Sequence, residues 1–200
     1  YASLKDTQAL TVEIIQSDGS KETQTFTLGE LESILYGEDV IKKDMDDQGR
    51  REKGWYAHKV YQNNLTEDLF EGVNLWYLLS EKIGMQGVLG DVSFYTAEDE
   101  ENPAAYISLA DLRAEGYNSL RETDGLGAMI AFAKNGYPLV DSKDAAAGYV
   151  DTDPTTGLTI KNNGGPLIFV RPQTEAEKNA GTVTTSGDMP MTVSNLTKIT

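Results

Sequence analysis

One short segment of the sequence gathers residue types that could bind a ligand or a metal ion. His58 is the only histidine of the chain, and Trp55, Tyr56 and Tyr61 lie close to it in the sequence. Imidazole is a common metal ligand, but a metal site needs several converging ligands, so we expect no metal site here. The aromatic side chains either line a ligand pocket or pack in the core, and their types fit both roles.

Two acidic segments resemble the opening of a calcium-binding loop. The residues of the first are Asp44, Asp46, Gln48 and Gly49, and the second is Asp151-Thr152-Asp153. A calcium loop ends with a bidentate glutamate, and Trp55 stands at the corresponding position of the first segment. We therefore expect both segments, like the acidic stretch 98–101, to be solvated loops without a structural calcium ion.

The sequence offers no familiar catalytic motif. It contains no Gly-x-Ser-x-Gly elbow, no phosphate-binding loop and no dinucleotide-binding glycine pattern, so hydrolase, nucleotidase and NAD-dependent activities have no support. It also contains no cysteine, which excludes disulfides, thiolate nucleophiles and iron–sulfur clusters. We assign no catalytic residue and no metal ligand.

Composition limits the class of protein and its partners. A chain of 200 residues with 39% hydrophobic content fits one domain over 1–200. Its net charge of −15 disfavours nucleic acids and anionic membranes as partners. No apolar run reaches the about 18–20 residues of a membrane span. The chain opens on Tyr1 rather than methionine, and with its abundant Thr, Asn and Gly we expect a secreted or cell-surface protein whose leader has been removed.

The first part of the chain predicts a hairpin followed by a short helix. Apolar and polar residues alternate through 10–14, Asp18-Gly19 forms a turn, and 23–27 returns as the second strand. Thr27 and Glu30 then form a capping box. The apolar residues of the helix share one face and comprise Leu28, Leu31, Ile34 and Leu35, and the helix should close near Gly37.

The middle of the chain predicts two strands and two helices. Aromatic and β-branched residues favour a strand over 55–62 and another over 92–95. An apolar stripe predicts a helix that closes at Gly84, and its residues are Leu75, Leu78, Leu79 and Ile83. Ser108 and Asp111 cap a second short helix, which turns Leu109 and Leu112 inward and ends near Gly116.

Two apolar runs predict the centre of the fold. The run 128–133 ends near Asn135-Gly136, and the run 167–170 follows Gly164-Gly165-Pro166. We expect them to be neighbouring central strands that are buried on both faces. The segment 192–200 predicts a last strand at a sheet edge. Because helices and strands mix without strict alternation, the fold class is α+β.

Four stretches, taken in order, resemble the molybdopterin-binding domain of the sulfite oxidase family. They are the capped helix at Thr27, the F-x-G-V-x-L-x-x-L-L run of Phe70–Leu79, the S-L-A-D-L run of 108–112, and the Asn-Gly and Gly-Gly-Pro pair. The resemblance covers about residues 8–200 and implies a mixed-sheet fold with a few short helices. It also implies molybdenum held by a pterin dithiolene and one cysteine.

The positions that would carry this chemistry have changed. The strand that the resemblance places before the G-V-x-L helix is about 55–62 here, and it holds no cysteine. Ile168 stands where the family has an arginine, and Val193-Ser194-Asn195 replaces its Val-Lys-Trp. Thiolate is the soft ligand that molybdenum needs, and an anionic pterin phosphate needs cationic donors.

We therefore expect a non-catalytic module with a degenerate molybdopterin-domain fold and no cofactor. It would bind a small ligand or a protein partner, and the candidate pocket residues are Trp55, Tyr56, His58 and Tyr61. The alternative is an oxidoreductase that binds a molybdopterin-type cofactor without a cysteine ligand.

Overall fold

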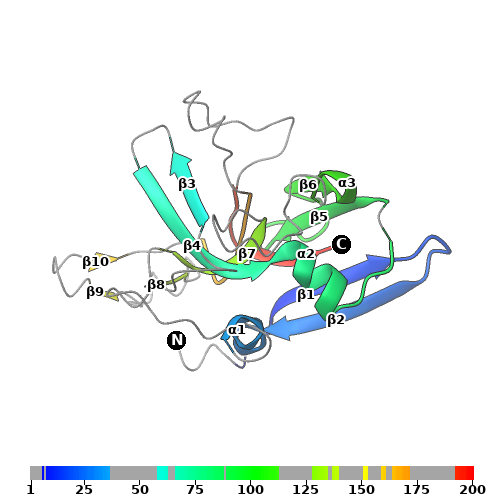
Figure 1. The fold of residues 1–200 in the computed structure, drawn as a ribbon, viewed down its shortest axis with the longest axis horizontal. Coiled ribbons are helices and arrows are strands. Elements are labelled where there is room, and N and C mark those ends of the chain that lie inside the picture. Colours follow the sequence, from blue (N-terminus) through cyan, green and yellow to red (C-terminus); the bar gives the residue numbers. More distant parts are fainter. Residues whose placement is uncertain are drawn as a thin grey trace.

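The computed structural model describes residues 6, 8–36, 58–62, 66–87, 89–112, 128–134, 137–139, 151–152, 159–160, 164–171 and 192–200. Within these ranges the protein is α+β, with mostly strands and a few short helices (Figure 1). Two sheets of five and six strands carry the structure, and β9 (Asp151–Thr152) and β10 (Thr159–Ile160) form a separate pair. None of the described helices has the length and apolar character to cross a membrane.

The chain starts with the predicted hairpin of β1 (Gln8–Ile15) and β2 (Lys21–Thr27). The turn closes through hydrogen bonds from the Gln16 N–H to the Ser20 carbonyl and from the Gly19 N–H to the Gln16 carbonyl, both of 2.9 Å. Gly19 has a φ of 84°, a conformation that glycine adopts without steric cost. The alternation of the sequence is confirmed, because Leu10 and Val12 are buried.

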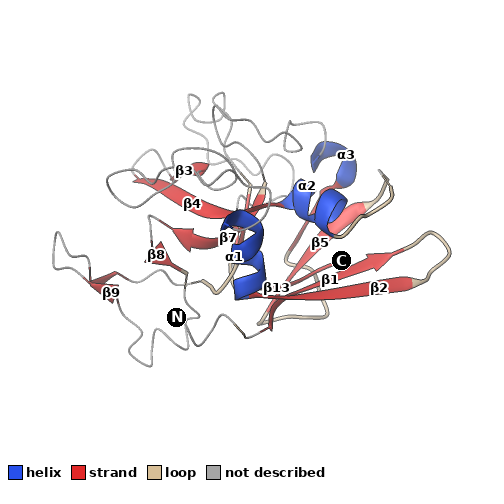
Figure 2. Cartoon of the chain, turned by 60° about the horizontal axis from the view of Figure 1, so that its bottom comes forward, coloured by secondary structure: helices blue, strands red, loops and turns tan. Residues whose placement is uncertain are grey.

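The first helix, α1 (Leu28–Tyr36), begins at the predicted capping box. The Glu30 N–H donates to Thr27 Oγ1 at 3.1 Å, and the Thr27 N–H donates to Glu30 Oε2 at 2.7 Å. Leu28, Leu31 and Ile34 are buried, as the stripe predicted. In two views α1 lies at the junction of the two sheets (Figures 1 and 2), and it contacts both β2 and β4.

The five-stranded sheet has the order β2-β1-β13-β5-β6. Its other members are β5 (Asp91–Thr96), β6 (Ala105–Ser108) and β13 (Leu196–Ile199). β1 and β13 run parallel, with Val12 opposite Ile199, while the remaining neighbours are antiparallel. The sheet is therefore mixed.

The prediction of one edge strand over 192–200 is wrong. The segment forms two strands in two sheets: β12 (Thr192–Val193) lies at an edge of the six-stranded sheet, and β13 lies inside the five-stranded one. Asn195, with a φ of 55°, separates them. Asparagine tolerates this left-handed conformation better than most residues, so the chain can turn there from one sheet to the other.

The six-stranded sheet has the order β12-β11-β7-β4-β3, and β8 (Tyr137–Pro138) also pairs with β7. Its strands include β3 (His58–Gln62), β4 (Thr66–Asn74), β7 (Met129–Lys134) and β11 (Ile168–Val170). β7 and β11 are antiparallel neighbours in the interior of the sheet, with Phe169 opposite Ile130. The prediction of two buried central strands is confirmed.

The two helices of the middle region are also present. Asn74 Oδ1 accepts a hydrogen bond of 3.0 Å from the Tyr77 N–H at the start of α2 (Leu75–Tyr77). The helix continues as a π-helical segment, η2 (Leu78–Lys82), in which the Ile83 N–H donates to the Leu78 carbonyl at 3.0 Å. Ser108 caps α3 (Leu109–Leu112) through a 3.0 Å bond from the Asp111 N–H. The expected ends at Gly37 and Gly116 lie outside the described residues.

One hydrophobic core joins the two sheets. Phe94 of β5 stacks on Phe169 of β11, with ring centroids 3.9 Å apart and an interplanar angle of 19°. Both rings are fully buried in a cluster that also contains residues of α1, α2 and α3. A smaller cluster lies apart from it and comprises Phe70, Met129, Ala131, Leu139, Ile168 and Val170.

Candidate ligand-binding site

The four pocket residues predicted from the sequence are only partly placed. Trp55 and Tyr56 lie outside the described residues, while His58 and Tyr61 lie on β3, opposite Phe70 and Glu67 of β4. The structure describes the backbone of β3 but not the directions of these side chains. That they line a pocket stays a prediction.

The strand before the G-V-x-L helix is β4, and not the strand over 55–62. β4 (Thr66–Asn74) forms a hairpin with β3 and leads directly into α2. A bulge between Glu71 and Gly72, where β4 pairs with β7, interrupts its register. The sequence pattern missed β4 because its first half is polar and its glycine is a poor strand residue.

The side chains of both acidic segments lie outside the described residues. Asp44–Gly49 lies outside the described residues, and of the second segment only the backbone of β9 is described. Among the residues whose side chains are placed, no three His, Cys, Asp or Glu come together. Whether calcium binds to the first segment therefore remains a prediction from sequence.

The acidic stretch 98–101 is an ordered loop that is tied to β13. Asp99 Oδ1 accepts hydrogen bonds from the Asn102 N–H at 2.9 Å and the Glu101 N–H at 3.0 Å. These bonds, with the Asn102 bonds contributing most, hold the pKa of Asp99 below its usual value. Lys198 Nζ donates to the Glu100 carbonyl at 2.8 Å. The exposed carboxylate of Asp99 thus organises the loop.

Two of the positions singled out by the resemblance, Ile168 and Ser194, have uncharged side chains in the structure. The Ile168 side chain is 5% exposed and packs with Phe70 and Met129 in the smaller apolar cluster, so it offers no donor to a phosphate. Ser194 is exposed and uncharged. The chain also has no cysteine to bind the metal.

One buried cation escaped the sequence analysis. Arg171 follows β11 directly and is only 2% exposed. The sequence feature that could have indicated a buried arginine is its position: Arg171 directly follows the apolar run 167–170 and precedes Pro172. Arginine is almost never fully buried without a partner, so its position marks a polar interaction at the end of β11.

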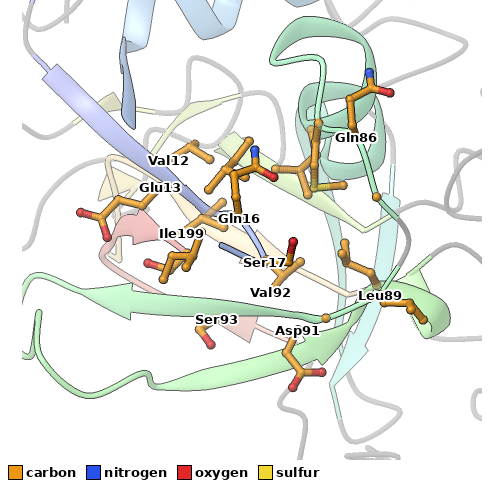
Figure 3. Close-up of a pocket in the computed structure, with 18 of the residues that line it drawn as sticks. Val12, Glu13, Gln16, Ser17, Gln86, Leu89, Asp91, Val92, Ser93 and Ile199 are labelled. Carbon is orange, nitrogen blue, oxygen red and sulfur yellow. The ribbon is translucent and has the colours of Figure 1, made fainter. Parts of the chain in front are cut away.

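The described part of the chain contains an open pocket of about 690 Å³ at the end of β13. Its lining comes from the second half of β1, the start of β5 and the segment that follows η2, together with Ile199 and Thr200. Figure 3 shows residues of these segments around the pocket. The pocket therefore sits where the sequence predicted no site. Its apolar lining is Val12, Ile14, Ile15, Leu79, Met85, Leu89, Val92, Leu109 and Ile199.

The polar lining of the pocket carries negative charge. Glu13 and Asp91 contribute carboxylates, and the remaining polar side chains are neutral. Among the lining residues that the structure describes, none is lysine, arginine or histidine. Because the whole chain also has a net charge of −15, the pocket attracts cations and repels anions.

Two exposed apolar side chains stand at this pocket. Leu89 is 89% exposed and Ile15 is 54% exposed, and both belong to the lining. In the described part of the chain only one other large apolar side chain is this exposed, Tyr106 of β6 at 55%, and it does not line the pocket. Local patterns could not predict this grouping, because Leu89 and Ile15 are far apart in the sequence.

No family model matches the sequence, and no curated protein is similar to it. What the structure offers as a guide to function is the pocket, with its concave shape, its apolar lining residues and its two carboxylates.

Proposed function

We propose that this chain is a non-catalytic binding module whose site is the pocket at the end of β13. The observation that supports it most is the exposure of Leu89 and Ile15 beside a concave apolar surface of about 690 Å³. Exposed apolar groups that gather around a pocket are typical of binding sites, because water leaves both surfaces when a ligand enters.

The charge of the pocket favours a particular ligand. Glu13 and Asp91 are its only charged lining residues that the structure describes. A ligand with an apolar body and no charge, or a positive charge near these carboxylates, suits the site. An anionic ligand would bury its charge without a cationic partner, and this costs free energy.

We further propose that the fold is a divergent form of the sulfite oxidase-like molybdopterin domain, in a secreted or cell-surface protein. The order of the elements supports this relation: the hairpin and capped α1, the Gly72–Leu75 stretch that leads into α2, the capped α3, and the paired strands β7 and β11. The missing cysteine and the burial of Ile168 among apolar residues favour a module without the cofactor.

The binding proposal is tested with a neutral solvatochromic dye, Nile red, titrated into the protein. We expect saturable binding and expect the double variant Ile15→Ser/Leu89→Ser to raise the Kd about tenfold or more, since each buried apolar side chain contributes about 1.5–3 kcal/mol. Tyr106→Ser is the matched control, because Tyr106 is as exposed as Ile15 but lies outside the pocket. Absent binding, or an equal loss in the control, rejects the pocket as the site.

The cofactor proposal is tested by metal analysis of protein made in a molybdenum-replete host. We expect no molybdenum and no dithiolene absorption, because the chain has no thiolate ligand. A cysteine-containing sulfite oxidase from the same host is the positive control. Stoichiometric molybdenum in the unmodified protein would favour the oxidoreductase alternative.

A further inference from the structure

β2 forms one edge of the five-stranded sheet, and none of the described strands pairs with its far side. Figure 1 shows β2 as the outermost strand of this sheet, beside β1. Residues 21–25 are all exposed, and the register with β1 is regular from Lys21 to Phe26. Edge strands are usually protected by shortness, proline, bulges or charges. Here the only charges, Lys21 and Glu22, stand at the start, so the rest of β2 is open to pairing.

The turn of the hairpin shows which backbone groups join β1 to β2. The Gln16 N–H donates to the Ser20 carbonyl, and the Gln16 carbonyl accepts from the Gly19 N–H. The polar backbone groups of Gln16 therefore face the side of β2. Because these groups alternate in direction along a strand, those of Ile14 and Val12 face β2 as well.

The backbone groups of β2 alternate in the same way. Glu22 and Gln24 stand opposite these two residues of β1, so their backbone groups bond to β1. The N–H and carbonyl groups of Lys21, Thr23 and Thr25 therefore face the free edge, where the described strands offer them no partner. They form a regular row of donors and acceptors that a further strand can use.

We propose that β2 pairs antiparallel with β2 of a second copy of this chain, about a two-fold axis at Thr23, and joins the two five-stranded sheets into one. Thr23 then pairs with Thr23 of the second copy, and Lys21 pairs with Thr25 of the second copy. In each pair both residues turn their backbone groups toward the other strand, so the pair exchanges both of its hydrogen bonds. The same surface of each copy forms the contact, as a two-fold axis requires.

The side chains favour this register over its neighbours. It places Glu22 opposite Gln24 of the second copy, whose side-chain amide can donate to the carboxylate. An axis at Glu22 would set two carboxylates directly opposite each other, which is destabilising. An axis at Gln24 or at Thr25 would require the backbone N–H of Thr27, which already donates to Glu30 Oε2 at 2.7 Å.

A second copy fits this edge better than a flexible peptide does. Its β2 is already held extended by β1, so association costs less conformational entropy than the ordering of a free peptide. The net charge of −15 on each copy opposes association at low ionic strength. Salt screens this repulsion, so association should become tighter as the salt concentration rises, whereas binding of a basic partner would become weaker.

The test is sedimentation equilibrium at about 0.02 and 0.3 M NaCl over a range of protein concentrations. We expect a reversible monomer–dimer equilibrium that is tighter at the higher salt concentration. Thr23→Pro removes an N–H that faces the free edge and makes no bond to β1, so the fold should tolerate it. It should weaken the dimer at least about tenfold. Thr23→Val keeps the N–H and is the matched control, with an expected change below about threefold.

Substitutions at Thr25 test the register, because Thr25 lies opposite Lys21 of the second copy. Lys21 pairs only weakly with Glu13, at 3.9 Å and partly exposed, so it can bind a new carboxylate. Thr25→Glu should strengthen the dimer about threefold or more, and Thr25→Lys should weaken it by a similar factor. Net charge alone would give the opposite order, since Thr25→Lys makes the chain less negative.

Hydrogen exchange gives the location of the contact: the amides of Thr23 and Thr25 should exchange more slowly at high protein concentration. A chain that is still monomeric at about 1 mM in the higher salt overturns the proposal. A dimer that Thr23→Pro leaves intact does so as well, because another surface then holds the copies together. If Thr23→Pro does not fold, the two Thr25 variants decide, and shifts in the same direction or no shift reject the pairing of β2 with β2.

Discussion

Phe169→Asp should lower the free energy of unfolding by about 3–5 kcal/mol, the range measured when a buried charge loses its partner. Phe169 is fully buried, it stacks on Phe94 with 3.9 Å between centroids, and it pairs with Ile130 across the β7–β11 ladder. An aspartate there would bury a carboxylate among apolar side chains and would remove the ring that joins the two sheets. Ile130→Asp should have an effect of the same size for the same reason.

Urea denaturation measures the effect. Phe169→Leu keeps the site apolar and should cost about 1–2 kcal/mol, so it reports on the contact even if the aspartate variant does not fold. Tyr106→Asp, on an exposed position of β6, is the control and should change stability by less than about 0.5 kcal/mol. If Phe169→Asp melts within a degree or two of the parent, the central position of β11 is wrong.

The elements that the sequence predicted well are those that short-range chemistry determines. The side chains of Thr27 and Glu30 each accept a hydrogen bond from the backbone N–H of the other residue, three positions away. Asp18-Gly19 fits only a turn, in which Asp18 Oδ1 accepts a hydrogen bond from the Ser20 N–H. Each depends on neighbours in the sequence alone. The runs around Ile130 and Phe169 were recognisable because strands buried on both faces need continuous apolar residues.

The elements that the sequence missed depend on distant partners. β13 holds only four residues, and it is a central strand because β1 and β5 lie on its two sides. Nothing within 192–200 specifies that β1 will pair with it in parallel. The same is true of Asn195, where a left-handed residue turns the chain from one sheet to the other. Tertiary context decided both features.

The candidate site was missed for a related reason. Aromatic residues near His58 suggested a pocket by their type, whereas the observed pocket is made of ordinary aliphatic and acidic side chains. What distinguishes Leu89 and Ile15 is their exposure, and exposure arises only when β1, β5 and the segment after η2 come together. A residue list without the fold contains no such signal.

Gly72→Ala should destabilise the protein by about 3 kcal/mol or more, at or above the upper end of the range for overpacking. Gly72 lies at the bulge of β4, opposite Ala131 of β7. A Cβ atom on it would overlap the Ile130 carbonyl oxygen and would lie 2.5 Å from the Ala131 Cα. These are backbone atoms of the central strand, so no side-chain rotation can relieve the overlap, and the β4–β7 ladder would have to separate.

Gly84→Ala is the matched control for this prediction. Gly84 has a φ of 76°, but an added Cβ would meet no atom within 4 Å. The control therefore carries only the cost of a left-handed backbone, about 1–2 kcal/mol. Urea denaturation of both variants separates steric overlap from backbone strain. If Gly72→Ala costs no more stability than Gly84→Ala, then β4 and β7 do not approach as closely as the structure places them. The end of β4, which leads directly into α2, would then have a different position.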